Sequence, residues 1–504
     1  MTIRINNDLS KSRSQTASSR LRDFVVNSSP GEDMSRPSHF RLRTSEGSVL
    51  VIVLWMALGL VSITLYFASS MTLELRAADN RVSSLSANQA IEAGARYVES
   101  VLTTFATNGA VPDVSGYLSE DVPVGDAHFW LIGRAGDNAA QMQPDQVFFG
   151  LIDEGSKLNL NYASTTLLGN LTNVTPELAA NIYDWCHTNS TPSQNGDGPM
   201  VYAQFQPGYL CKQGPFETVD ELRLVYPMDL ETLIGEDANR NGALDPSETD
   251  TNRNGVVDPG LVEFVTVYSR EPNTRPDGSQ RINVSRVSTG NAQLTELLRT
   301  NLSSARFATV GLAIGLISPP SRNGPGQQQQ RPTTPTPTTT RSFSSPLAFY
   351  LASGMTADEF APIGNALTVA SGSFIHGRIN VNTASLAVLA CLVQGDSAQV
   401  QQLVAYRQSY PDKLTSIAWV VDALGRNNAT RLAQNDYLTT QSYQFTADIA
   451  AVGPYGRGYQ RVRFVFDTTS GTPQIVYRQD LSGLGWALGR YVRRDILMAS
   501  SQRN

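Results

Sequence analysis

RLRTSEGSVLVIVLWMALGLVSITLYFASSMTLELR, residues 41–76, contains a run of 26 residues without a charged side chain, residues 48–73. At about 1.5 Å per residue, some 20 helical residues cross a hydrocarbon layer of roughly 30 Å. A secretory signal has a shorter apolar region and then a small-residue cleavage site, which does not follow here. The run therefore predicts one membrane-spanning helix, and an ordinary signal anchor is the simplest alternative.

The charges on either side of the run predict its orientation. Three arginines precede it between residues 36 and 43, whereas the first four charged residues after it, within 74–81, are two acidic and two basic. The positive-inside rule therefore places the first 47 residues in the cytoplasm and exports the rest.

The rest of the chain has the composition of a soluble protein. Of its 504 residues 17% are charged, and the mean hydropathy is -0.21. A net charge of -6 argues against a general polyanion binder, because neutralising phosphates requires clustered Lys and Arg. The length leaves room for more than one core.

The helix is predicted to continue beyond the membrane. Residues 48–110 contain no proline, and apolar residues recur mostly at steps of three and four up to Phe105. The positions of this face are Leu75, Ala78, Val82, Leu85, Ile91, Gly94, Val98, Val101 and Phe105. We expect one helix over 48–110, with its membrane half at 48–70 and its exported half packed on a globular head.

The start of the run resembles the processing junction of the type IV pilin-like proteins. In that family a prepilin peptidase cuts after a leader glycine, and the new N-terminus is methylated; the resemblance implies cleavage between Gly47 and Ser48. Major pilins carry glutamate at the fifth mature position, where this chain has Ile52. A carboxylate inside a bilayer persists only beside a partner amine, so a subunit with nothing above it needs none.

The missing glutamate is the pattern of one branch, the minor pseudopilin K family of type II secretion. Three further segments are similar to it: AIEAG at 90–94, DEGSKLNLN at 153–161 and FETVDEL at 216–222. The resemblance implies an α+β fold, in which the long helix packs on a small antiparallel sheet interrupted by a large α-helical domain. It also implies a non-enzymatic subunit at the pseudopilus tip, single-pass in the inner membrane with a periplasmic C-terminal domain. The implied partners are I-like and J-like minor pseudopilins, the prepilin peptidase and the inner-membrane secretion platform.

Strand patterns lie at both ends of the exported part. They are AHFWLI at 127–132, QVFFGLI at 146–152, YQFTADI at 443–449, QRVRFVF at 460–466 and PQIVYR at 473–478.

Two segments, the Pro-, Gln- and Thr-rich linker at 318–345 and most of the leader, cannot bury enough apolar surface to fold. The predicted parts are a leader (1–47), a long helix (48–110), first strands (111–155), a first helical repeat (156–317), the linker (318–345), a second helical repeat (346–440), last strands (441–482) and a tail (483–504).

An internal repeat lies inside the insertion. KLNLNYASTTLL at 157–168 matches RINVNTASLAVL at 378–389 at an offset of 221 residues, and each copy continues into a helical pattern at 176–185 or 397–406. These are expected to be helical modules of the SAM or helix-hairpin-helix type. Such modules also occur in membrane-anchored DNA-uptake receptors, but the turns at 171–175 and 392–396 are neither glycine-rich nor basic. We expect no nucleic acid; a DNA-uptake receptor and a minor pilin of a type IV pilus are the alternatives.

DANRNGALDPSE, residues 237–248, has the twelve-position spacing of a calcium loop, with oxygen-bearing side chains at positions 1, 3, 5, 9 and 12 and glycine at 6. The predicted ligands are Asp237, Asn239, Asn241, the Ala243 carbonyl, Asp245 and Glu248. Because several carboxylates crowd into a short segment, a structural Ca²⁺ would order the head by neutralising them. The alternative is a pair of Asn-Gly turns in an acidic surface loop.

A second loop follows with the same residue types at its first nine positions. Its predicted ligands are Asp250, Asn252, Asn254, the Val256 carbonyl and Asp258. Its twelfth position is Leu261, so the bidentate carboxylate is missing, and Glu263 two residues later is the predicted substitute. We expect one structural calcium site and a weaker second one.

Three cysteines exclude a disulfide scaffold but permit one bridge in a periplasmic head, for which Cys186 and Cys211 are the predicted pair. We expect Cys391 to be a small buried core residue.

No catalytic residue is predicted, because the four histidines are scattered and the sequence has no H-E-x-x-H, C-x-x-C, Walker lysine loop or G-x-S-x-G.

Overall fold

The computed structural model describes residues 47–136, 142–188, 191–318 and 340–501. The predicted leader, except Gly47, and most of the predicted linker lie outside these residues. The chain divides into two units, Met1–Thr72 and Leu73–Asn504, of which the second holds the compact head.

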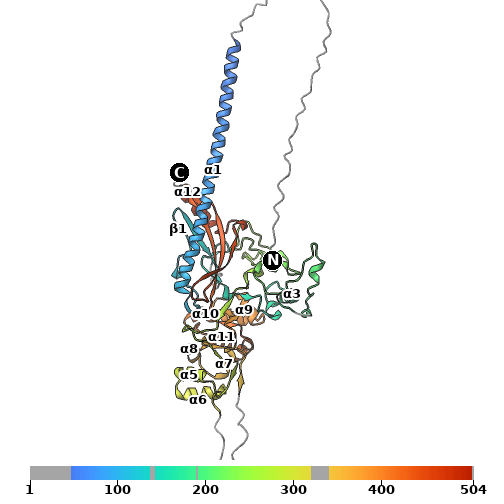
Figure 1. Cartoon of the computed structure of the whole chain (residues 1–504), viewed down its shortest axis with the longest axis vertical. Helices are drawn as coiled ribbons and strands as arrows, with labels where there is room; N and C mark the ends of the chain where they lie inside the picture. Colours follow the sequence, from blue (N-terminus) through green and yellow to red (C-terminus); the bar gives the residue numbers. More distant parts are fainter. Residues whose placement is uncertain (1–46, 137–141, 189–190, 319–339, 502–504) are drawn as a thin grey trace, which may run out of the picture. The chain divides into compact units, whose positions relative to one another are not determined.

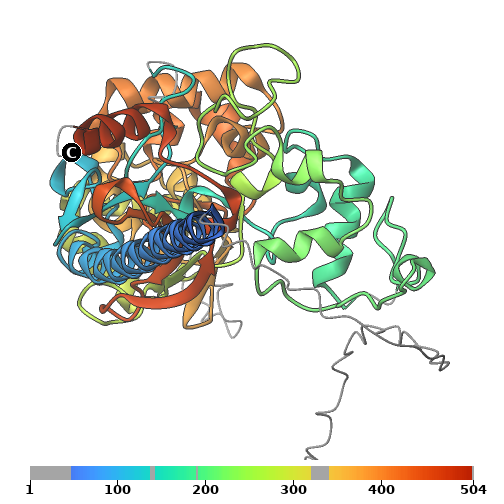
Figure 2. The same ribbon diagram turned by 90° about the horizontal axis from the view of Figure 1, so that it is seen from above.

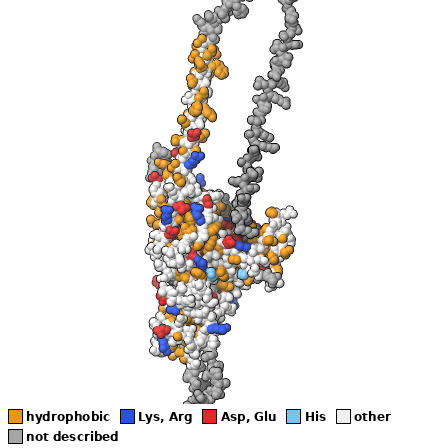
Figure 3. Space-filling model, viewed as in Figure 1, with side chains coloured by type: hydrophobic (Ala, Val, Ile, Leu, Met, Phe, Trp, Pro, Cys, Tyr) orange, Lys and Arg blue, Asp and Glu red, His pale blue; other side chains and the backbone are white. Residues whose placement is uncertain are grey.

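One helix, α1 (Gly47–Phe105), runs through both units. It is the one helix among the described residues that is long and apolar enough to cross a membrane, and its most apolar part buries no side chain in the protein. Figure 3 shows its hydrophobic side chains open along this part. An apolar surface of this size requires lipid or neighbouring helices to cover it, which fits the predicted single-pass anchor.

The C-terminal half of α1 packs on the head. Its buried residues recur at helical spacing: Ala87, Ala90, Ile91, Ala95, Val98, Val101 and Leu102. The predicted apolar face is confirmed for Ile91, Gly94, Val98 and Val101, but Val82 and Leu85 are 65% and 60% exposed, and Leu75, Ala78 and Phe105 are exposed as well. The periodicity therefore continues for more than a turn beyond the point at which α1 leaves the sheet.

A six-stranded antiparallel sheet forms the other side of this core, with the order β1-β2-β14-β15-β16 and β3 paired to β14. Its strands are β1 (Val122–Val124), β2 (Ala127–Ile132), β3 (Ile152–Asp153), β14 (Gln444–Val452), β15 (Gln460–Asp467) and β16 (Gln474–Asp480). In the central pairs Leu131 lies opposite Ile449 and Ala447 opposite Phe464. The long helix and the antiparallel sheet are as predicted.

The predicted strand 146–152 is mostly wrong. Only its last residue belongs to β3, and Phe149 forms an isolated bridge with Ile132. The N–H group of Leu151 donates to the hydroxyl of Tyr117 at 2.8 Å, so this backbone group is satisfied by a side chain instead of a neighbouring strand. An apolar run alone does not show where its backbone hydrogen bonds go.

A large insertion separates β3 from β14. Its first part contains η4 (Glu154–Ser156), β4 (Leu158–Asn159), α2 (Thr165–Leu168), α3 (Pro176–Cys186), η5 (Val201–Gln204), η6 (Val219–Leu224), α4 (Leu230–Ile234), η7 (Leu261–Glu263), β5 (Val265–Thr266), β6 (Arg270–Pro272), β7 (Ile282–Asn283), β8 (Arg286–Val287), α5 (Ala292–Asn301) and α6 (Ser304–Ala313). Its second part contains β9 (Arg341–Ser342), α7 (Pro346–Ser353), α8 (Ala357–Gly364), β10 (Leu367–Thr368), β11 (Phe374–His376), β12 (Ile379–Asn380), α9 (Leu386–Leu392), α10 (Ser397–Ser409), η8 (Pro411–Lys413), α11 (Trp419–Leu432) and β13 (Leu438–Thr439). The segment around α3 forms a lobe to one side (Figures 1 and 2).

The two copies of the repeat adopt the same order of elements. Strand β4 pairs in parallel with β5, and β12 pairs in parallel with β13. The helices α2 and α3 begin 221 residues before α9 and α10, the offset found in the sequence. Buried apolar residues from both copies belong to one continuous core. The copies therefore pack as one body around a shared interior.

A buried ion cluster ties the sheet together. Asp448 on β14 is fully buried and lies 2.7 Å from Arg461 and 2.9 Å from Arg463, both on β15. These two guanidinium groups hold the pKa of Asp448 well below its usual range, against the opposing effect of burial. The Arg461 side chain is also fully buried, so each charge depends on the other.

Replacing Asp448 by Ala is expected to lower the free energy of unfolding by about 3–5 kcal/mol, because Arg461 would remain buried without its counter-ion. Urea or thermal unfolding of the detergent-solubilised full chain measures this. Arg478, which pairs with Glu92 at an exposed position on β16, is the matched control, and Arg478→Ala should cost less than about 1 kcal/mol. Equal losses for the two variants would contradict the argument.

Candidate metal site

The first predicted loop, residues 237–248, winds around a single centre. Arg240 and Gly242 adopt positive φ values of 59° and 78°. The carboxylate of Asp237 accepts hydrogen bonds from the N–H groups of Asn241 and Gly242, both at 2.9 Å, and Asn239 Oδ1 accepts from Asn241 N–H at 3.0 Å. The alternating Asp and Asn residues thus fold the backbone by accepting from N–H groups a few residues further on.

Glu248 closes this loop. Its two carboxylate oxygens accept from the N–H groups of Asn239, at 3.1 Å, and Asp245, at 3.0 Å. Asp245 Oδ2 in turn accepts from the side-chain amides of Asn239, at 2.6 Å, and Asn241, at 2.8 Å. The structure therefore brings together all five side chains predicted as ligands of the first loop.

The carboxylates of this loop lie in a poorly solvated position. Asp237 is 3% exposed and Asp245 is 7% exposed. Burial raises the pKa of Asp237, Asp245 and Glu248, and the nearby Arg134 guanidinium opposes this at Asp237. A bound divalent cation would act in the opposite direction, because it stabilises the charged form of each carboxyl group.

The donor atoms fit a hard cation. Carboxylate, carboxamide and carbonyl oxygens are the ligands of Ca²⁺, and the loop offers no nitrogen or sulfur donor. Across the described residues, His, Cys, Asp and Glu side chains do not gather in a group of three or more that could hold a metal ion. In the first loop the side-chain oxygens accept hydrogen bonds from N–H groups, and each oxygen keeps a further lone pair with which it could bind Ca²⁺.

The first loop is fixed to the six-stranded sheet. Arg461 Nη2 donates to the Arg240 carbonyl at 2.8 Å, and its Nη1 donates to the Asn239 carbonyl. Ala243 is fully buried against Trp130 and other residues on the sheet face opposite α1. Any change in this loop therefore reaches the sheet directly.

The loop also holds the C-terminal segment. Asn239 Nδ2 donates to the Trp486 carbonyl at 3.2 Å, and Asn241 Nδ2 donates to the Ala487 carbonyl at 3.1 Å. Each of these asparagines thus places its oxygen inside the loop, while its amide group donates both to Asp245 and to the C-terminal segment.

The second loop repeats the same bonding at an exposed position. Arg253 and Gly255 have φ values of 59° and 76°, and Asp250 accepts from the N–H groups of Asn254 and Gly255. Asp258 Oδ2 accepts from the side-chain amides of Asn252 and Asn254. Val256 is 54% exposed.

The carboxylate that closes the second loop is Glu236. It accepts from Thr251 N–H at 2.6 Å and from Asp258 N–H at 3.2 Å, which resembles the role of Glu248 in the first loop. Glu263, the substitute predicted from the sequence, instead forms a two-pronged ion pair with Arg134 at 2.6 and 2.9 Å. Glu236 was missed because it precedes the first loop and lies outside any twelve-position pattern.

The remaining predicted site residues lie elsewhere. Gly47 and Ser48 stand at the start of α1, and Ile52 is 56% exposed on it. Cys186 and Cys211 are free thiols, and burial raises the pKa of Cys186 to about 12. Cys391 is buried, as predicted.

Comparisons with known proteins agree with the two repeats. A family model described as "Type II secretion system (T2SS), protein K" of the first-domain type matches residues 155–234, and a second model with the same description matches residues 379–436. No curated protein matches the chain. Among solved structures, a chain of the GspK–GspI–GspJ complex of the enterotoxigenic Escherichia coli type 2 secretion system aligns with 9% identity and a TM-score of 0.38, covering 78% of this chain and 96% of that one.

The two family matches fall on the two copies of the repeat, in the order of the chain and on either side of the two candidate loops. This chain therefore belongs to the protein K family of the type II secretion system and is a minor pseudopilin of that system.

Proposed function

We propose that this minor pseudopilin stands at the tip of the pseudopilus and initiates or caps it. The position of the insertion supports this. Helices α5, α6, α7 and α8 lie beyond the Phe105 end of α1 (Figure 1), where the next subunit of a filament would begin. The apolar Ile52 supports the same position in the filament. A first subunit has no N-terminal amine of another subunit above it, so it needs no glutamate at this point of the helix.

The proposed partners are I-like and J-like minor pseudopilins of the same system, which would pack along α1. Its exposed apolar residues in the head, Leu75, Val82 and Leu85, are 63%, 65% and 60% exposed. Similar helices stacked side by side would cover them. The prepilin peptidase and the inner-membrane secretion platform are the further proposed partners, before and during assembly.

The two helical repeats serve as packing modules in this proposal. At the α9–α10 turn the N–H groups of Gly395 and Asp396 donate to the carbonyls of Ala390 and Val393. A DNA-binding hairpin would leave such groups open to a phosphate. The turn also ends in the carboxylate of Asp396, which would repel one.

Processing should begin the mature chain at Ser48. N-terminal sequencing and mass spectrometry of the membrane-extracted protein should show a methylated Ser48, and Gly47→Ala should remain uncut. Gly59→Ala is the control within the same apolar run, because Gly59 has nothing within 4 Å that a methyl group would meet; it should be processed normally. A mature chain starting elsewhere would contradict the pilin-like junction.

A structural role for Ca²⁺ is the second part of the proposal. The first loop joins the insertion, the sheet and the C-terminal segment, so an ion there would strengthen the junction of all three. For the second loop we propose Glu236 as the closing carboxylate in place of Glu263. The geometry that supports this is the pair of backbone N–H groups held by Glu236 and the engagement of Glu263 with Arg134.

Calcium should raise the thermal midpoint of the full chain by roughly 5 °C at concentrations far above the dissociation constant. Calorimetric titration should give two sites. Glu248→Gln should weaken calcium binding at the first loop, and Glu236→Gln should weaken calcium binding at the second loop alone.

Glu231→Gln on α4 is the matched control for this titration, because Glu231 lies outside both loops, and it should change neither site. If Glu263→Gln removed the second ion and Glu236→Gln did not, the assignment of Glu236 would be wrong. No effect of calcium or EGTA on the midpoint would remove the calcium proposal altogether.

The Cys186–Cys211 disulfide remains a prediction. Both thiols are free in this structure, and an oxidising periplasm would permit the bridge. Thiol titration of the denatured, unreduced protein should find one free thiol, and Cys391→Ser should leave none. Three free thiols in the wild-type chain would rule out the bridge.

A further inference from the structure

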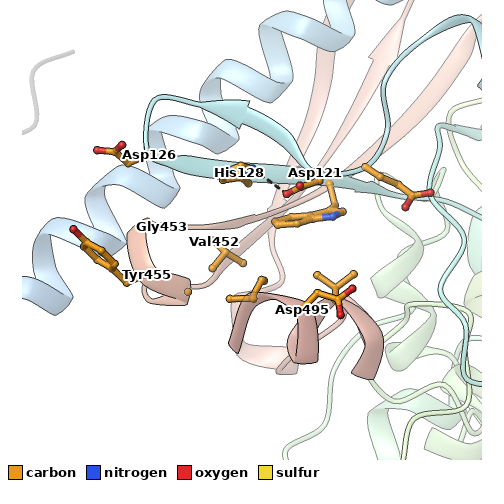
Figure 4. Close-up of a pocket in the computed structure, with 12 residues that line it drawn as sticks. Asp121, Asp126, His128, Val452, Gly453, Tyr455 and Asp495 are labelled. Carbon is orange, nitrogen blue, oxygen red and sulfur yellow. Dashed lines mark ion pairs between the residues drawn. The ribbon is translucent and has the colours of Figure 1, made fainter. Parts of the chain in front are cut away.

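The last helix, α12 (Gly489–Ser501), is fixed to the head by one face. Val492 and Ile496 pack against the cluster that contains Trp130. With Trp130 and Val452 they also line a cleft of about 470 Å³, which Figure 4 shows between α12, the β1–β2 hairpin and the 453–456 turn. The inward face of α12 thus packs against the head and borders this cleft.

The same turn places α12 beside α1. Gly456 lies against Ile496, and a Cβ at Gly456 would stand 2.4 Å from the Ile496 side chain. Gly453 and Gly458 approach the backbone of Ser83 so closely that a Cβ at either would stand 2.3 Å from it. Arg457 adds an ion pair to Asp79 at 3.8 Å.

These contacts bring α12 close to the end of the apolar run. The charge-free run ends at Leu73, ten residues before Ser83, which is about 15 Å along a helix. Figure 1 shows α12 at the end of the head from which residues 73–83 of α1 emerge. A lipid surface that meets α1 near Leu73 would therefore lie within reach of an amphipathic helix at this position.

The outward face of α12 is basic and apolar. Arg490, Arg494 and Leu497 follow one another at helical spacing opposite Val492 and Ile496. Together with Arg493 and Met498 they line one shallow hollow. Leu497 is 60% exposed and Met498 is 54% exposed.

The charges of this face are only partly compensated. Arg490 contacts Asp145, and Arg494 lies 3.3 Å from Asp495 at an exposed position. Arg493 is exposed on the same helix. Four acidic side chains, Glu120, Asp121, Asp126 and Asp495, line the cleft on the other side of α12. Arg490 also shares a hollow with Asp145, Asp245, Glu248 and Asp250, so the basic character of the outward face rests on Arg493 and Arg494. Anionic headgroups would therefore be attracted to the outward face and repelled from the cleft.

We propose that α12 is a second membrane contact, which docks on anionic lipid headgroups beside the point where α1 leaves the bilayer. The inference rests on the proposed membrane-anchored pseudopilin and adds to it a lipid-binding surface on the head. Arginines bind the headgroups, and Tyr491, Leu497 and Met498 insert at the interface, the mode of basic amphipathic helices. The docked head is held in one orientation until the subunit leaves the membrane.

The full chain reconstituted in nanodiscs provides the test. Discs of phosphatidylcholine alone are compared with discs that also contain phosphatidylglycerol, and amide hydrogen exchange is followed over residues 489–501. Exchange should be about tenfold slower in the anionic discs, and high salt should remove the difference. The triple variant R490E/R493E/R494E should exchange equally fast in both.

The matched control carries the same charge change elsewhere on the head. Arg299, Arg426 and Arg431 are exposed on α5 and α11, and R299E/R426E/R431E should keep the lipid-dependent protection. Protection that is equal in both discs, or that survives the α12 triple variant, would overturn the lipid assignment and favour a protein partner. Failure of the wild-type chain to enter discs at all would instead remove the membrane anchor, and the inference with it.

Discussion

The guanidinium of Arg461 is the constraint on which the rest of the head depends. It is fully buried and cannot lose its charge, so each of its N–H groups needs an acceptor. Asp448 supplies two oxygens from the neighbouring strand, and the carbonyls of Asn239 and Arg240 supply the others. Those carbonyls belong to the insertion. One side chain of the sheet therefore fixes the first candidate loop.

This arrangement explains how a large insertion can interrupt a small sheet without loosening it. The insertion returns to the sheet through buried polar contacts at several places. Asp153, at the end of β3, accepts from the hydroxyl groups of Thr383 and Ser442, and Glu154 accepts from Thr266 and Thr446. Breaking such a contact leaves a buried polar group unpaired, which is costly. The buried polar contacts make the insertion and the sheet cooperative.

The sequence predicted the features that depend on local pattern. The charge-free run gave α1, the apolar segments gave β2, β14, β15 and β16, and the twelve-position spacing gave the convergence of Asp237, Asn239, Asn241, Asp245 and Glu248. Each of these follows from side chains close together in the chain. The offset of 221 residues likewise located two copies of the same element order.

The predictions that the structure does not follow concern features set by contacts between distant segments. Glu236 and Glu263 are both acidic residues near the second loop, and only the position of Arg134 after β2 decides which of them is free to close it. The exit of α1 from the sheet is set by the close approach of Gly453 and Gly458 to Ser83, not by apolar periodicity. No local pattern contains this information.

The two proposed ligands of the head meet at one segment of the chain. The asparagines of the first loop hold the carbonyls of Trp486 and Ala487, and α12 begins at Gly489. A calcium ion that fixes the oxygens of Asn239 and Asn241 would also fix their amide groups, because each carboxamide is planar. In this proposal the direction of α12 would thus be coupled to calcium binding at the first loop. Metal binding and lipid docking would then stabilise the same conformation of the C-terminal segment, and each would favour the other.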